Sequence, residues 1–169
     1  MLQYNVVKNM EKNGLAEKTI VIPVDEWYGL SLDDTCVKVK IRITGHSMQP
    51  LIRRNRDFVT IQPLRRKALK GDIVLFRNVD GRYIVHRVRR VYDDGVQTMG
   101  DNRLSPDTKI LEKDVLGLVT HIHRGSRTIF VDTRIWRLLG RLHMAAAPLR
   151  RAAAFVFRPL KRMLGRMVR

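Results

Sequence analysis

The chain has 169 residues, enough for one compact domain with a sizeable core but too few for two comfortable domains. Its 33 Lys and Arg residues outnumber 16 Asp and Glu residues, and the resulting net charge of +17 favours an anionic partner. A lone cysteine, Cys36, excludes an intrachain disulfide and is expected to be structural. We expect no cleavable signal in residues 1–18 and no membrane-spanning helix, which predicts a cytoplasmic or peripheral membrane location.

The first predicted elements are strands. Residues 1–36 are expected to form an N-terminal extension that packs on the domain. From Val37 to Thr44 apolar and polar residues alternate, which predicts a half-buried strand. Further short strands are predicted at 58–61, 72–76, 83–91, 96–99 and 115–123, with turn residues such as Asp80-Gly81 and Asp94-Gly95 between them. This pattern predicts a mainly β, antiparallel and partly closed domain over residues 37–132.

The character of the chain changes at Thr133. Residues 133–169 contain ten basic residues and no acidic ones, which leaves a net charge of +7 for residues 1–132. Apolar residues recur at helical spacing in two stretches, 135–142 and 156–167, with arginines between them. The sequence therefore predicts a basic amphipathic helical tail. Binding to an anionic membrane surface is its favoured role, ahead of packing on the domain or a partner, and nucleic acid is the least favoured ligand.

Three short clusters carry the residue types of a hydrolytic site. Ser47 lies in Gly-His-Ser-Met-Gln-Pro (45–50), and His86 lies in Tyr-Ile-Val-His-Arg-Val (83–88). Asp101 lies in Gly-Asp-Asn-Arg (100–103), and Asp107 follows shortly after. A serine hydroxyl is inert near neutral pH unless a base takes its proton, and that base usually needs an orienting group. We therefore expect Ser47 and His86 to lie within hydrogen-bonding distance.

These boxes, together with Gly-Asp-Ile-Val-Leu-Phe (71–76), resemble the signal peptidase I and LexA-like serine peptidase superfamily over residues 37–124. The resemblance implies the same coiled β fold. His86 stands at the base position, which is similar to the Ser-His-Asp branch of archaeal and endoplasmic-reticulum signal peptidases. Two features depart from that branch: no spanning helix is expected, and Gly45 stands where signal peptidases usually carry a serine that helps hold the oxyanion.

The resemblance also implies a role for each residue. Ser47 would be the nucleophile and His86 the base, while the family carries acids at the positions of both Asp101 and Asp107. We favour Asp107 as the carboxylate that orients His86 and expect Asp101 to be structural or supporting. Met48 and Pro50 are predicted to shape the substrate cleft, or simply to pack. Clefts of this family bind an extended peptide and favour small residues beside the cut.

Other chemistries are less well supported by the sequence. His121 and His123 share a strand face, but no third ligand is spaced to join them, so neither a metal nor any other cofactor is expected. Lys70 is the one lysine close to a motif that could replace the histidine as base. Its place before Gly71-Asp72 favours an ordinary turn lysine.

The prediction for function is a serine endopeptidase that cleaves a leader, signal or propeptide, with a peptide or protein as substrate. The alternative is a catalytically inactive β-fold module that uses its basic tail to bind membrane or nucleic acid. A self-cleaving LexA-like regulator is disfavoured. The residues ahead of Ser47 are too few for a DNA-binding module and a scissile segment, and the chain has no Ala-Gly bond.

Overall fold

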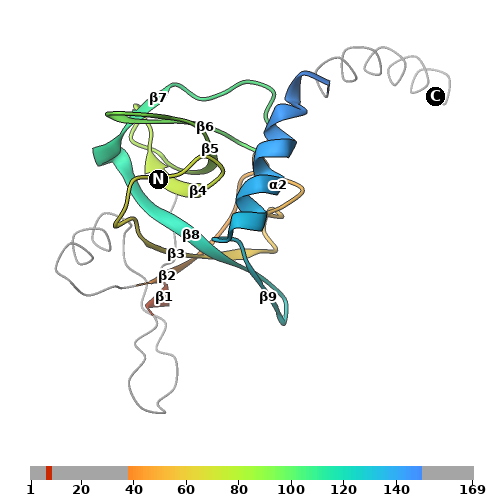
Figure 1. Ribbon diagram of the computed structural model, residues 1–169. Coiled ribbons are helices and arrows are strands. Elements are labelled where there is room, and N and C mark those ends of the chain that lie inside the picture. The colour runs from red at the N-terminus through yellow and green to blue at the C-terminus, as the bar shows by residue number, and fades with distance from the viewer. Residues whose placement is uncertain (1–6, 9–37, 150–169) are drawn as a thin grey trace, which may run out of the picture.

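The computed structural model describes residues 7–8 and 38–149, and these residues form one antiparallel sheet with a helix against it (Figure 1). The strands are β1 (Val7–Lys8), β2 (Val39–Arg42), β3 (Phe58–Pro63), β4 (Ile73–Arg77), β5 (Tyr83–Tyr92), β6 (Gly95–Met99), β7 (Lys109–Leu111), β8 (Val115–Arg124) and β9 (Arg127–Phe130). A short 3-10 helix, η1 (Glu112–Asp114), precedes β8, and α2 (Arg134–Ala145) follows β9. The predicted mainly β antiparallel fold with a C-terminal helix is confirmed.

The strand order shows how distant parts of the chain come together. Neighbouring strands run β1-β2-β3-β8-β4-β5-β6-β7, and β9 pairs with β8 beside this path. The path is open, because its two ends do not pair with each other among the described residues. β8 is central: its residues 117–123 pair with β3 and its residues 115–118 pair with β4, so it joins β2 and β3 to β4 and β5. The sheet coils around β8 (Figure 1).

The alternation predicted around β2 is observed. Val39, Ile41 and Ile43 are buried, whereas Lys40 is half-buried and Arg42 is exposed. They pack in a core with Ile61, Val119, Ile122 and other apolar residues of β3, β4 and β8. A second core of Val74, Phe76, Val88, Val96 and Leu118 lies between β4, β5, β6 and β8. These two cores hold β5, the strand that carries His86.

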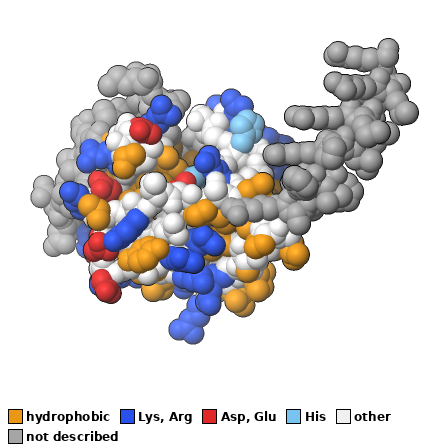
Figure 2. All heavy atoms as spheres, turned by 90° about the horizontal axis from the view of Figure 1, so that it is seen from above, with side chains coloured by type: hydrophobic (Ala, Val, Ile, Leu, Met, Phe, Trp, Pro, Cys, Tyr) orange, Lys and Arg blue, Asp and Glu red, His pale blue; other side chains and the backbone are white. Residues whose placement is uncertain are grey.

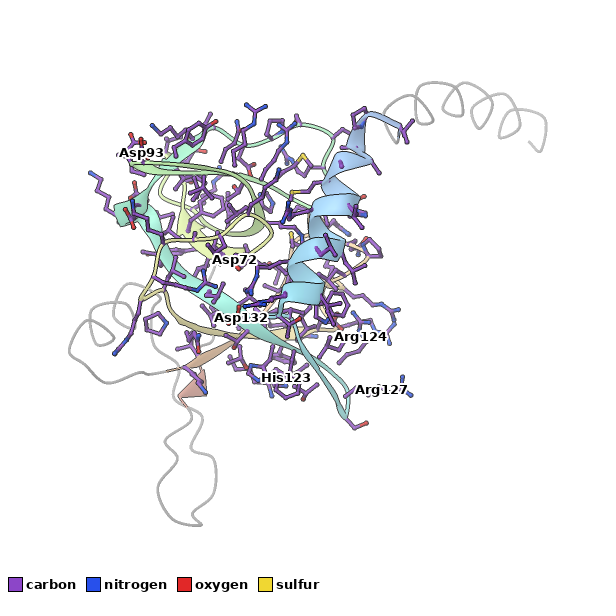
Figure 3. The ribbon with its side chains drawn as sticks, viewed as in Figure 1. Asp72, Asp93, His123, Arg124, Arg127 and Asp132 are labelled. Carbon is purple, nitrogen blue, oxygen red and sulfur yellow. The ribbon has the colours of Figure 1, made fainter. Side chains whose placement is uncertain are left out.

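Helix α2 begins at a capped end and packs on β5. Thr133 is its N-cap, and the Thr133 hydroxyl accepts a hydrogen bond from the Trp136 amide at 3.3 Å. Arg137 binds Asp132 at 2.8 Å and Asp72 at 3.4 Å, so the first turn is joined to the turn before β4 (Figure 3). The first predicted helical stretch therefore lies in α2. The second stretch, like Cys36 and nearly all of the predicted N-terminal extension, lies outside the described residues.

Candidate active site

Ser47 lies in the loop between β2 and β3, which we call the serine loop (residues 43–57). The loop is closed at its base, where the Asn55 amide donates to the Ile43 carbonyl at 2.8 Å. Asp57 is fully buried and accepts from Arg124 of β8 at 2.7 Å, and Arg124 also donates to the Leu51 carbonyl at 2.7 Å. Burial alone would raise the pKa of Asp57, but its hydrogen bonds from Arg124 and from the Arg53 amide hold that pKa below its ordinary value. The serine loop is therefore fixed to β8.

His86 lies on β5 beside the second core. Its side chain is almost fully buried, and its ring lies 6.1 Å from the ring of Phe76, between centroids. Ring atom Nε2 is 2.8 Å from the Ser47 hydroxyl, and Nδ1 is 2.7 Å from a carboxylate oxygen of Asp107. The structure thus brings a hydroxyl, an imidazole and a carboxylate into one chain of hydrogen bonds.

Asp107 lies in the segment between β6 and β7. The hydroxyl of Thr98, a fully buried residue of β6, donates to the same Asp107 oxygen at 2.7 Å, and the Asp107 amide donates to the Thr98 carbonyl at 2.9 Å. Burial alone would raise the pKa of Asp107, but the hydrogen bonds from His86 and Thr98 and the charge of Arg103 lower it below its ordinary value. Asp107 is therefore an anion near neutral pH.

The charge of Asp107 assigns the protons of His86. An ionised carboxylate can only accept hydrogen bonds, so Nδ1 of a neutral His86 must carry the ring proton. The lone pair of Nε2 then faces the Ser47 hydroxyl, which donates its proton. This is the tautomer that a general base requires, and the arrangement can take the serine proton as the oxygen attacks a carbonyl carbon.

Asp101 has a different partner. Its two carboxylate oxygens accept from Nε and Nη2 of Arg87, each at 2.8 Å, and both side chains are buried. Arg87 also donates to the Gly71 carbonyl at 2.9 Å. The structure places Asp107 beside His86, and it places Asp101 in a bidentate ion pair on the other face of β5.

The Gly-Asp-Asn segment (100–102) contacts the serine loop through backbone atoms. The Asn102 amide donates to the Ser47 carbonyl at 2.7 Å. A Cβ atom on Gly100 would stand 2.6 Å from that carbonyl oxygen and 2.9 Å from Nε2 of His86, so only glycine fits between the two. At Gly45 a Cβ atom would meet nothing closer than the Ser47 hydroxyl at 3.9 Å, an ordinary contact. Position 45 therefore points at the nucleophile and has room for a side chain.

The two residues predicted to shape the cleft lie in different surroundings. Pro50 is exposed and lines a pocket of about 330 Å³ together with Leu51, Ile129, Trp136 and Leu139. Met48 is 1% exposed and belongs to the first core, which favours its packing role. Another hollow, of about 840 Å³, borders Asp107 and is lined by Ile84, Arg103 and Pro106 among others. That either residue contacts a substrate stays a prediction.

The rival residues lie away from Ser47. Lys70 is exposed in the turn before Gly71, which has a φ of 101°. The rings of His121 and His123 stack with centroids 6.1 Å apart, and His123 bonds to the Thr60 hydroxyl at 2.7 Å. Within the described residues, no three or more His, Cys, Asp or Glu side chains gather as a metal site would require.

Sequence reasoning missed two parts of the site, Thr98 and the Arg87–Asp101 pair. Alternation along 96–99 places Thr98 on the same strand face as Val96, but a hydroxyl on a strand gives no indication of its distant acceptor. Arg87 stands next to His86 in the motif, and its partner could not be inferred because that pairing depends on the path of the chain after β6.

Comparisons with known proteins agree with this architecture. The family model Peptidase S24-like matches residues 17–120, which is more than half of the chain. The chain belongs to the Peptidase S24-like family, and so to the wider group of LexA and signal peptidase I folds. Neither the comparison with curated proteins nor that with solved structures gave a match. Across the part of the chain that the structure describes, no helix is long and apolar enough to cross a membrane.

Proposed function

We propose that this protein is a serine endopeptidase in which Ser47 is the nucleophile, His86 the general base and Asp107 the residue that orients His86. The observation that carries the proposal is the hydrogen-bond chain from the Ser47 hydroxyl through His86 to Asp107, at 2.8 and 2.7 Å. Membership of a family with a serine peptidase fold supports it. The use of histidine as base also supports the finer assignment to the Ser-His-Asp branch of signal peptidases.

The proposed reaction has two steps. His86 Nε2 takes the Ser47 proton while the serine oxygen attacks the peptide carbonyl, and the protonated imidazole then gives that proton to the departing amine. A water molecule, activated by the same imidazole, hydrolyses the resulting ester and restores the serine. The Ser47 amide is the proposed donor to the oxyanion. A leader, signal or propeptide, bound in extended form, is the proposed substrate.

A library of short soluble peptides, analysed by mass spectrometry, tests the proposal. The full-length chain should produce cleavage at a defined set of sequences, and Ser47→Ala should abolish it while keeping the melting temperature. Cleavage that persists in Ser47→Ala would assign the activity to a contaminant. A folded wild-type protein that cleaves no peptide would contradict the proposal.

A catalytically inactive binding module is the second candidate, and Gly45 is the observation that favours it. Position 45 points at the Ser47 hydroxyl, but glycine supplies no side-chain donor for the oxyanion. An inactive module should still be folded and should bind library peptides without turnover. Incubation of the library with wild-type protein, followed by recovery of bound and cleaved peptides, separates the two candidates.

A further inference from the structure

Helix α2 carries an apolar stripe on the side that faces away from the domain. Ile135, Leu138, Leu139 and Leu142 are 70%, 52%, 49% and 59% exposed. They recur at intervals of three and four residues, so they form one continuous surface along the helix. The face toward the sheet is instead lined by Trp136, Gly140, His143 and Met144, which are buried or half-buried. Among the described residues the outward stripe is therefore largely exposed, and Leu139 lies at its edge, beside the pocket that Pro50 and Trp136 also line.

The contacts of α2 prevent the stripe from turning inward. A Cβ atom at Gly140 would collide with the guanidinium of Arg87, so the helix backbone lies directly on that side chain. His143 Nε2 is 2.8 Å from the Asp101 carbonyl oxygen, and Met144 packs with Met99 in a small third core. These contacts fix the rotation of α2 about its axis and leave the outward stripe in solvent.

The charges around the outward stripe select its partner. Arg134 and Arg141 are exposed beside it, and residues 133–169 contain ten basic and no acidic residues. On the face shown in Figure 2, the acidic side chains gather on the side away from α2. A second copy of α2 would bring like charges together, which opposes self-association. An anionic bilayer fits this surface, because its phosphates can bind the arginines and its acyl chains can cover the apolar stripe.

We propose that the outward stripe of α2 is a docking surface for an anionic phospholipid bilayer. The leucines enter the boundary between headgroups and acyl chains, and the bordering arginines bind lipid phosphates. The stripe lies outside the residues that the family model matches, 17–120.

Docking also orients the candidate active site. His143 of α2 bonds to the Asp101 carbonyl, and the next residue, Asn102, bonds through its amide to the Ser47 carbonyl. Trp136 and Leu139 of α2 and Pro50 of the serine loop line the same pocket. A bilayer bound to α2 therefore holds the serine loop close to the membrane surface. The docking itself does not depend on Ser47 being catalytic.

Vesicle sedimentation of the full-length protein tests the proposal. We expect binding to phosphatidylcholine vesicles that contain phosphatidylserine, and little binding to phosphatidylcholine alone. The double variant Leu138→Ser with Leu142→Ser removes apolar surface without changing charge, so its affinity should fall by about tenfold or more. The matched control is Val79→Ser with Val91→Ser, which removes two exposed valines of the β domain and should bind like the wild type.

Three results would overturn the proposal. The leucine variant could bind vesicles as tightly as the wild type, which would assign the attraction to the basic residues alone. The wild type could ignore anionic vesicles at low salt. It could instead form a dimer that Leu138→Ser with Leu142→Ser abolishes, which would make a second copy the occupant. Circular dichroism should show equal melting temperatures for all variants. The peptide-cleavage assay, with Ser47→Ala as its inactive control, is carried out separately from vesicle binding, so the two proposals can fail independently.

Discussion

Two neighbouring residues of β5 each bind one of the two aspartates that follow β6, and the two pairs differ in what they can do. His86 binds Asp107 at 2.7 Å, and Arg87 binds Asp101 at 2.8 Å. Arginine stays protonated at all working pH values, so the Arg87–Asp101 pair is a permanent clamp. A neutral imidazole has one nitrogen that can accept a proton, and His86 directs that nitrogen at the Ser47 hydroxyl, so the His86–Asp107 pair can move a proton.

The surroundings of the two pairs follow the same division. Arg87 donates one further bond, to the Gly71 carbonyl, and lies against the backbone of Gly140 in α2, so its pair joins β5 to the turn before β4 and to the helix. The second nitrogen of His86, Nε2, faces the Ser47 hydroxyl at 2.8 Å. Equal distances therefore do not imply equal roles: one pair holds the fold, and the other is available for chemistry.

The largest expected effect separates these two roles directly. Asp107→Asn should lower kcat by roughly 10³- to 10⁴-fold, because an amide no longer fixes the tautomer of His86 or stabilises its protonated form. Asp101→Asn should instead lower the free energy of unfolding by about 3–5 kcal/mol, because it leaves the Arg87 charge buried without its partner. Peptide cleavage at a temperature where both variants are folded, with urea unfolding of each, measures the two effects.

The folded fraction of each variant must be measured as a control, because unfolding would also lower kcat. If Asp101→Asn loses as much kcat as Asp107→Asn while remaining fully folded, the division between clamp and proton-transferring pair is wrong. Equal losses of stability in the two variants would contradict it as well.

Much of this arrangement could be predicted from the sequence, because its signals are local. Alternation from Val39 to Ile43 identifies β2, and the spacing of Ile84, His86 and Val88 places His86 on an apolar face. The family resemblance implies acids at both positions without ranking them, and the structure places Asp107 beside His86 and Asp101 beside Arg87. The short strands β7 and β9 were missed, since three or four residues carry too little periodicity.

The remaining features depend on contacts between distant segments. Gly140 lowers the intrinsic stability of α2, and its reason, the Arg87 guanidinium, lies on another element. The apolar residues of α2 suggested an amphipathic helix, but the sequence could not say that its apolar stripe faces outward. Helical periodicity identifies a stripe without identifying what covers it.

Gly100 connects the two pairs, and enlarging it should disturb the reactive one. A Cβ atom there would lie 2.6 Å from the Ser47 carbonyl oxygen and 2.9 Å from His86 Nε2. Gly100→Ala should therefore push the serine loop and the imidazole apart and lower kcat by about 10²-fold. Gly45→Ala is the matched control, because its Cβ atom makes only an ordinary contact and should leave kcat nearly unchanged. Similar kcat values for both variants would show that the close approach at Gly100 has no bearing on the chemistry.

The Thr98 hydroxyl donates to Asp107 of the His86–Asp107 pair, so its loss should have a pH-dependent effect. The Thr98 hydroxyl bonds to ionised Asp107 and helps to lower its pKa below the ordinary 3.8. A lowered carboxyl pKa stabilises the fold above that ordinary value, and the contribution is lost as pH falls through the lowered pKa. Thr98→Val should thus be less stable than the wild type by about 1.5 kcal/mol at neutral pH.

This difference in stability should narrow as the pH falls below 3.8. Urea unfolding of both proteins across the acid range measures it. Thr98→Ser restores the hydroxyl and should recover most of the loss. A gap that stays constant with pH would mean that Thr98 acts through packing alone.

The smallest expected effect is a gain in kcat from a side chain added at Gly45. Position 45 points at the Ser47 hydroxyl, its backbone does not have the positive φ that would strain a side chain, and its nearest contact is 3.9 Å away. A hydroxyl added there would donate to the oxygen that becomes negative when Ser47 attacks a carbonyl. Gly45→Ser should therefore raise kcat about fivefold, which corresponds to about 1 kcal/mol of transition-state stabilisation. Gly45→Ala fills the same space without a donor, so a serine variant no faster than the alanine variant would show that the added hydroxyl does not reach the oxyanion.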